Sequence, residues 1–223
     1  MFETEDCNVA HFKVSVIKDD EWIANCLRRG YEWDGWMRQD LPHIYKPGTD
    51  LLDIGGNIGY NALMYSDYGP VHTFDPIFHP VITKNVNQNQ LKNPITVHPY
   101  GLSSYEHMAE IALPPRGDNG LCNYGGTSLK GFENSMHRQE IQLKRLVDVY
   151  NGTPSVIKLD IEGHEFEAIK GAEAIIAKHH PALYVEWFAE MKDSEIHNFL
   201  KPYGYNTIIE RPEHNWLMLC NHS

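Results

Sequence analysis

A glycine-rich turn after a short apolar stretch is the first segment whose residue types point to ligand binding. Residues 51–59 read LLDIGGNIG. Glycines let the backbone turn sharply and let a ligand approach the main-chain amides. The spacing differs from the GxGxxG turn of dinucleotide sites and suits a zwitterionic ligand. We expect Asp53 to accept from an ammonium group. The amides that would face a carboxylate belong to Gly55, Gly56, Asn57 and Gly59. The alternative is a glycine-rich turn that binds no ligand.

A second carboxylate, Asp75, ends the next apolar stretch, VHTFD at residues 71–75. An acidic residue about 20 positions after a glycine turn, at the end of the neighbouring strand, can accept hydrogen bonds from both hydroxyls of a ribose. We therefore predict that Asp75 binds a ribose. By position alone, the residues that would flank the attached base are Pro76, Phe78 and residues 100–103, which include Leu102 and Ser103.

A cluster of ionisable side chains follows a third mainly apolar stretch, residues 155–159. They are Asp160, Glu162, His164 and Glu165. Ligands of open α/β sheets meet side chains at the carboxyl ends of the strands, so we expect Asp160, Glu162 and His164 to line an active site. Glu165 and Glu167 are explained by the preference of acidic residues for a helix N-terminus.

The elements that must position these residues form an α/β pattern. After residue 48, short apolar runs alternate with helical patterns, which is typical of a mostly parallel sheet with helices on both faces. The link between the last two runs is too short for a crossover helix, so those strands should form an antiparallel hairpin. We predict strands at residues 50–54, 71–75, 95–100, 155–161, 182–187, 205–210 and 216–220, and helices at 59–68, 79–90, 164–178 and 194–200.

Two segments extend this pattern within what we expect to be a single domain, residues 1–223. Residues 1–47 should form an N-terminal cap with a strand at 11–17 and helical turns after it, whose aromatic side chains we interpret as core without chemistry. Residues 103–154 are an insertion with a strand near 108–113 and a Gly/Asn-rich loop. Long irregular loops are usually functional, so we expect this insertion to contact the substrate.

Composition narrows the classes of partner. The 223 residues carry a formal net charge of -11, which disfavours binding to nucleic acid because phosphates are repelled. The four cysteines form no CxxC pair, and the N-terminus lacks the pattern of a signal peptide. No apolar run approaches the ~18 residues of a membrane span. We expect a soluble, cytoplasmic protein, and the sequence leaves its oligomeric state open.

Four motifs, LLDIGGNIGYNAL, VHTFDP, VIKLDIEGHEFEAIKGA and PALYVEW, together resemble the FkbM family of methyltransferases over roughly residues 48–190. The first motif is shared by many class I methyltransferases, whereas the third is more specific. The resemblance implies a Rossmann-like class I methyltransferase fold, a seven-stranded mostly parallel sheet with an antiparallel last strand, and S-adenosyl-L-methionine as methyl donor. Asp75 stands where many relatives carry Glu, which still suits a ribose.

The resemblance further implies O-methylation of a hydroxyl on a small-molecule or glycan acceptor, most often a sugar. Asp160, Glu162 or His164 would then assist removal of the hydroxyl proton, and Asp160 would also contact the donor. Asp160 and Glu186 could hold Mg²⁺ through hard oxygen ligands. A methyltransferase for another small molecule, an NAD-linked oxidoreductase and a binding-only protein are the alternatives.

Overall fold

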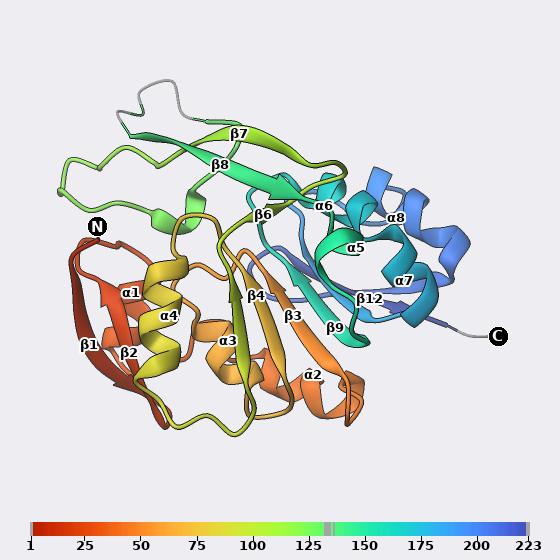
Figure 1. Cartoon of the computed structure of the whole chain (residues 1–223), viewed down its shortest axis with the longest axis horizontal. Helices are drawn as coiled ribbons and strands as arrows, with labels where there is room; N and C mark the ends of the chain where they lie inside the picture. Colours follow the sequence, from red (N-terminus) through yellow and green to blue (C-terminus); the bar gives the residue numbers. More distant parts are fainter. Residues whose placement is uncertain (1, 132–134, 136, 222–223) are drawn as a thin grey trace.

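The computed structural model describes residues 2–131, 135 and 137–221. Its largest element is a seven-stranded sheet built from β3 (Asp50–Ile54), β4 (Val71–Phe74), β5 (Ile95–His98), β9 (Pro154–Leu159), β10 (Ala182–Glu186), β11 (Tyr205–Glu210) and β12 (Asn215–Cys220). The strand order is β11-β12-β10-β9-β3-β4-β5 (Figure 1). β12 is antiparallel to β10 and to β11, and the remaining neighbours are parallel. The predicted seven strands and the antiparallel last hairpin are confirmed.

Helices cover both faces of this sheet, because the strands carry apolar side chains on both faces. Leu52 and Ile54 of β3 pack in a core with α5 (Leu146–Val149), α6 (Glu165–Gly171), α7 (Glu173–His179) and α8 (Glu195–Leu200). Leu51 points to the other face and packs with α2 (Met37–Ile44) and α3 (Tyr60–Tyr65). A near-continuous apolar strand such as β3 is the expected pattern for a strand buried on two faces.

Two smaller sheets flank the main one. β1 (Thr4–Val9) and β2 (Phe12–Ile17) form an N-terminal hairpin beside α4 (His79–Asn87), to which Asn85 joins it through Ser15. β6 (Gly101–Leu102), β8 (Arg138–Lys144) and β7 (His107–Ala112) form a three-stranded sheet across the top of the view in Figure 1. A short helix α1 (Ile23–Arg28) lies against the hairpin. The insertion thus supplies two of the three strands of this sheet, β7 and β8, and β6 directly precedes it.

Some element boundaries were predicted wrongly. The strand predicted for residues 95–100 ends at His98, and Gly101 and Leu102 pair with β8 instead. The helix predicted for residues 164–178 is divided at Ala172, whose amide bonds to Ile169, three residues back. β1 and β8 were not predicted, because most of their side chains are exposed or only partly buried and carry little apolar periodicity.

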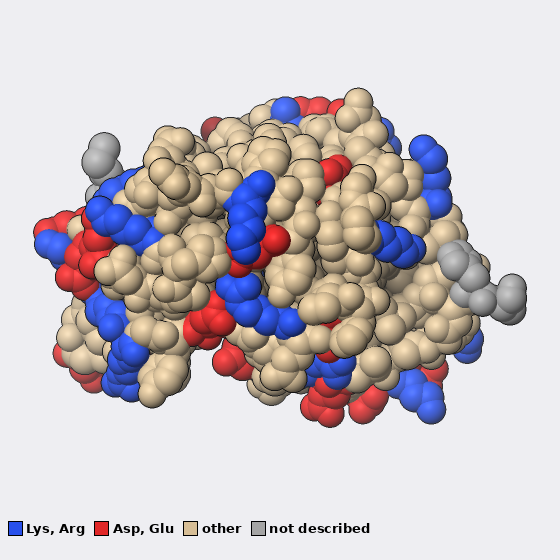
Figure 2. Space-filling model, turned by 90° about the horizontal axis from the view of Figure 1, so that it is seen from below, with Lys and Arg blue, Asp and Glu red and all other residues tan. Residues whose placement is uncertain are grey.

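The surface combines both signs of charge. On the face in Figure 2, basic and acidic side chains lie interspersed. Exposed pairs such as Arg145 with Asp148, at 2.8 Å, are of this kind and contribute little to stability. Within the described residues, no helix is long and apolar enough to cross a bilayer.

Close packing of α6 against β6 gives a test of the fold. A Cβ added to Gly171 would lie 2.0 Å from the carbonyl oxygen of Ser103. Although alanine is the better helix former by about 1 kcal/mol, we expect Gly171→Ala to lower the free energy of unfolding by about 2 kcal/mol or more, because a backbone contact must shift. Urea denaturation measures this loss. The control Ala174→Gly, at an exposed position of α7, should cost only about 1 kcal/mol; an equal or smaller loss in Gly171→Ala would contradict the close contact.

Candidate active site

The residues predicted to be functional follow neighbouring strands of the main sheet. Ile54 is in register with Phe74 of β4 and with Leu159 of β9, so the segments after these strands begin side by side. Backbone bonds continue past the strand ends: the amide of Asp160 donates to Ile54 at 3.0 Å, and that of Gly55 to Phe74 at 3.0 Å. The carboxyl edge of the sheet thereby gathers three turns at one place.

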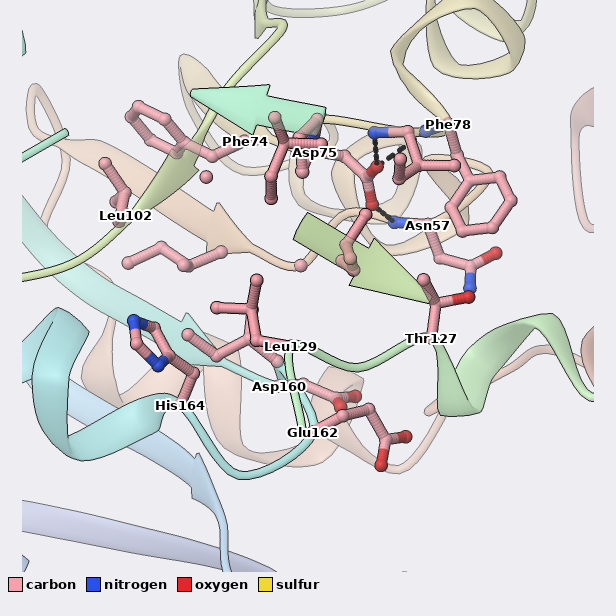
Figure 3. Close-up of a pocket in the computed structure, with 18 of the residues that line it drawn as sticks. Asn57, Phe74, Asp75, Phe78, Leu102, Thr127, Leu129, Asp160, Glu162 and His164 are labelled. Carbon is pink, nitrogen blue, oxygen red and sulfur yellow. Dashed lines mark hydrogen bonds between the residues drawn. The ribbon is translucent and has the colours of Figure 1, made fainter. Parts of the chain in front are cut away.

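A first cavity of about 620 Å³ opens at this edge (Figure 3). Asn57, Asp75, Asp160 and Glu162 supply polar groups on part of its wall. The rest is largely apolar and comes from the turn after β4, from β6 and from the insertion: Pro76, Ile77, Phe78, Leu102, Ile111, Leu129, Ile141 and Leu143. Such a wall suits a ligand with a flat apolar part and a few polar groups.

The carboxylate of Asp75 links two turns at the rim of this cavity. One oxygen, Oδ1, accepts from the amides of Ile77 (2.8 Å) and Phe78 (2.6 Å), and Oδ2 accepts from the amide of Asn57 at 2.9 Å (Figure 3). Burial raises the pKa of Asp75 to about 6, although these amides oppose the shift. A carboxylate has about four acceptor positions, so Asp75 can still accept from a ligand hydroxyl.

The glycine turn approaches its neighbours too closely for larger residues. Gly55 has φ +89°, and a Cβ there would lie 1.8 Å from the carbonyl oxygen of Asp160. Gly55, Gly56 and Asn57 line the cavities, but the amides predicted to face a carboxylate donate within the protein: those of Gly55 and Gly56 to Phe74, that of Asn57 to Asp75 and that of Gly59 to Gly56. Gly59 packs against Ile82 of α4 and is outside the lining of both cavities described here.

Asp53 lies beneath the turn rather than on its surface. It is fully buried, its Oδ2 accepts from the hydroxyl of Thr73 at 3.2 Å, and its Oδ1 has no hydrogen-bond partner among the described residues. Burial raises the pKa of Asp53 to about 6, with Lys158 opposing the shift. Because Asp53 lines neither cavity, its predicted direct contact with an ammonium group has no support in this geometry.

A second cavity, of about 1390 Å³, adjoins the first. The wall that both share consists of Gly55, Asn57, Gly125, Asp160 and Glu162. The N-terminal segment contributes Trp22, Ile23, Trp33 and Asp34 to the second cavity alone. The aromatic residues of that segment were interpreted as core, and for Trp22, which is 57% exposed, this was wrong. The two cavities offer adjoining places for two ligands.

Three carboxyl groups meet where the cavities join. Oxygens of Asp160, Glu162 and Glu186 lie within 4.8 Å of one another. Burial, followed by the charges of Asp160 and Glu165, raises the pKa of Glu162 to about 7. Burial and the same neighbourhood of carboxylates raise the pKa of Glu186, whose Oε2 is buried without a hydrogen-bond partner in the described structure. This donor set fits a hard cation or a shared proton.

Hydrogen bonds from two different segments fix the turn that contains Glu162. Glu162 has φ +56°, a left-handed conformation that non-glycine residues rarely adopt. Oε1 of the buried Glu165 accepts from the amides of Ile161 (2.9 Å) and Gly163 (3.1 Å), and the hydroxyl of Ser128 donates to the carbonyl of Glu162 at 3.0 Å. Glu165 therefore fixes this turn, beyond the helix-terminus role predicted for it.

Lys158 places a buried positive charge under these carboxylates. Its Nζ donates to Oδ2 of Asp160 at 2.7 Å and lies 3.8 Å from Oδ2 of Asp34. Burial alone would lower the pKa of Lys158, but the carboxylates of Asp160, Asp34 and Asp53 raise it, so the ammonium group stays charged. Sequence reasoning missed Lys158, although it stands in the third motif, and had no local signal for Asp34.

The structure places His164 away from the three carboxyl groups. His164 lines only the first cavity, on the side of Leu102 (Figure 3), and its Nε2 lies 3.0 Å from the hydroxyl oxygen of Ser103. Burial lowers the pKa of His164. Ser103 is buried behind it and lines neither cavity, whereas Pro76 and Leu102 line the first. This position favours a supporting role for His164.

Comparisons with known proteins identify relatives of this chain. The model described as "Methyltransferase FkbM domain" matches residues 53–207. The hexuronic acid methyltransferase AglP of Haloferax volcanii is 35% identical over 124 residues, which are 54% of this chain and 48% of that protein. The crystal structure of methyltransferase FkbM from Methylobacillus flagellatus superposes with a TM-score of 0.51 at 18% identity, covering 77% of this chain and 43% of that one. The chain thus spans about half the length of its curated relative, and the superposition supports a methyltransferase-like α/β fold.

The raised pKa of Glu186 predicts a stability that depends on pH. The unfolded chain releases this proton near pH 4.5 while the folded protein keeps it, so its contribution to stability is lost as pH rises above that value. Glutamine carries no such proton. We expect Glu186→Gln to match wild type near pH 4 and to exceed its free energy of unfolding by more than about 1 kcal/mol at pH 8, measured by urea denaturation in EDTA. The control Glu210→Gln, at an exposed position, should not differ from wild type; a destabilised Glu186→Gln at pH 8 would refute the burial argument.

Proposed function

Because the chain belongs to the FkbM methyltransferase family, we propose that it is an S-adenosylmethionine-dependent O-methyltransferase that acts on a hydroxyl of a sugar or glycan. The observation that supports this most is the pair of cavities that share a wall at Asp160 and Glu162. A methyl donor in one and an acceptor in the other would meet at that wall. The named activity of the Haloferax relative supports a sugar-type acceptor. The sheet order suits the Rossmann-like class I arrangement.

The first cavity is our proposed donor site. Its largely apolar wall with a few polar groups suits a ligand with a flat apolar part. Asp75 would accept from the ribose, and Pro76 and Leu102 would pack against the adenine. The amides of Gly56 and Asn57 already donate to Phe74 and Asp75, so we assign neither of them to the donor carboxylate. When bound, the donor supplies a methyl group on a positively charged sulfur. The carboxylates of the shared wall favour that charge.

The second cavity is our proposed acceptor site, and Asp160 is the proposed general base. Asp160 lies on the shared wall, and Lys158 fixes one of its oxygens, so the carboxylate is oriented before the acceptor binds. It would take the proton of the acceptor hydroxyl as the oxygen bonds to the methyl carbon, whose bond to sulfur breaks to leave a neutral thioether. Glu162, with a pKa of about 7, is the alternative base. Alignment can reach effective molarities of roughly 10⁵ M or more, and a base adds about 10²- to 10⁴-fold.

A divalent ion fits the same place. Asp160, Glu162 and Glu186 would hold it, since their oxygens lie within 4.8 Å of one another and Oε2 of Glu186 has no other partner in the described structure. Such oxygen ligands suit Mg²⁺. The ion would supply a Lewis acid that orients and acidifies the acceptor hydroxyl.

The insertion, residues 103–154, is proposed to cover the donor and to border the acceptor. Leu129 and Leu143 line the first cavity, Asn123 lines the second, and Gly125 lines both. Most of its contacts are thus on the donor side. Within the insertion, the segment around Asn123 and Gly125 is therefore proposed to contact the acceptor.

Donor binding is tested by calorimetric titration of S-adenosylmethionine and its demethylated product. We expect micromolar affinity in wild type and a loss of about 10- to 100-fold in Asp75→Ala, because hydrogen bonds from ribose hydroxyls to a carboxylate are lost. Since Asp75 also holds three amides, thermal melting of each variant is the control for folding. Asp148→Ala, at an exposed carboxylate outside both cavities, should bind like wild type. Absence of binding to wild type would refute the proposed function.

The role of Asp160 is tested by methyl transfer to glycoside acceptors from labelled donor. We expect Asp160→Asn to lower kcat by about 10²- to 10⁴-fold with a much smaller loss of donor affinity, because Asp160 also borders the donor cavity. His164→Gln should lower kcat less than about tenfold, because His164 lines only the donor cavity. Assays with EDTA and with added Mg²⁺ measure metal dependence. Full activity of Asp160→Asn would remove Asp160 from the mechanism, and wild-type turnover unaffected by EDTA would remove the ion.

A further inference from the structure

The wall of the second cavity that faces away from the donor is strongly acidic. Asp34, Glu186 and Glu213 line the second cavity and not the first. They lie beyond the shared pair Asp160 and Glu162, which face the donor. Among the described residues that line the second cavity, Lys158 is the sole lysine or arginine. The acceptor therefore meets an excess of negative charge.

Lys158 cannot offset this excess at the mouth of the cavity. Its ammonium group bonds to Asp160 and lies close to Asp34, deep in the sheet. Glu213 is in the exposed turn between β11 and β12, beside Asp34. Within the described structure, neither Glu186 nor Glu213 forms an ion pair with a lysine, arginine or histidine. Partial burial and the neighbouring Asp34 raise the pKa of Glu213, as expected for a carboxylate without a cationic partner.

Exposed aromatic side chains accompany these carboxylates. Trp22 is 57% exposed and Phe188 is 66% exposed, and both line the second cavity. The ring of His214 lies 4.9 Å from that of Phe188. Large exposed apolar side chains at the rim of a cavity mark a binding surface. A pyranose ring can place its C–H face on such rings while its hydroxyls donate to the carboxylates.

We infer that the acceptor is a saccharide without a negative charge, either neutral or amino-substituted, and that Glu213 is a specificity-determining residue that excludes uronic acids. This inference rests on the proposed sugar methyltransferase function. A carboxylate brought beside Glu213 and Asp34 would meet like charges, which cost affinity and reject the wrong ligand, and Glu186, which keeps its proton, would not offset them. Hydroxyl and ammonium groups are donors, and these oxygens accept from them.

A divalent ion bound to Asp160, Glu162 and Glu186 would not reverse this preference. One ion and Lys158 would still be outnumbered by the carboxylates of the cavity, and Glu213 would remain at the mouth without a cationic partner in the described structure. The expected selectivity is therefore the same with EDTA and with Mg²⁺.

The first test uses wild-type protein and matched methyl glycosides in the gluco, galacto and manno series. Each series contains the neutral sugar, its 2-amino derivative and its uronate. Transfer of labelled methyl from S-adenosylmethionine and saturation-transfer NMR report turnover and binding. We expect a neutral or amino sugar to exceed the uronate of its own series by at least about tenfold in kcat/KM. A uronate that matches or exceeds its neutral partner overturns the inference.

The second test changes the charge at the mouth. In Glu213→Gln the kcat/KM ratio of uronate to neutral sugar should rise at least about fivefold, and in Glu213→Lys further, because one like charge is removed and then reversed. The donor Kd should stay within about twofold. Glu210→Gln, an exposed carboxylate of β11 outside the cavity, should leave the ratio unchanged. An unchanged ratio in both Glu213 variants removes Glu213 as the specificity residue.

Failure of the proposed function gives a different result from failure of this inference. If the donor binds but no glycoside of any series is methylated or bound, the sugar class is wrong and both proposals fall. If uronates are methylated preferentially, the sugar methyltransferase stands and the charge argument alone is wrong.

Discussion

A buried ammonium group among carboxylates is the interaction on which the rest of this site depends. Lys158 is on β9 in the centre of the sheet, where an unpaired charge would cost several kcal/mol. Its contacts with Asp160 and Asp34 compensate this charge and connect the sheet edge to the N-terminal segment. Because its charge is used within the site, the carboxylates farther out stay unbalanced. That imbalance suits a positively charged methyl donor and an acceptor rich in hydrogen-bond donors.

The parallel register of the sheet explains why two ligands would meet at one place. Ile54 pairs with Phe74 on one side and with Leu159 on the other, so the turns after β3, β4 and β9 emerge together. Gly55 permits the close approach to the turn of Asp160. The reacting groups are thus held by strands, which are stiffer than the loops that cover the cavities. Burial, and then the charges of the neighbouring Asp160 and Glu162, raise the pKa of Glu186 at the same edge.

Sequence neighbours in the third motif have separate places in the structure. Asp160 and Glu162 belong to both cavities, whereas His164, two residues later, begins a helix and faces the donor side alone. A change from strand to helix rotates successive side chains to different directions. The motif therefore combines groups for transfer with groups that fix the donor cavity, such as His164 and its partner Ser103.

The sequence alone determined the seven strands and the turns after them, because apolar runs, glycines and carboxylates follow each other locally at Gly55, Asp75 and Asp160. Its local periodicity could not give the depth of Asp53 beneath the turn, nor the direction of His164. Tertiary structure alone brought Asp34 and Glu213 together with Asp160 at the second cavity. These residues come from distant segments, and the acidic cavity exists only because the packing of the N-terminal segment and the β11–β12 hairpin against β9 and β10 places their carboxyl groups side by side.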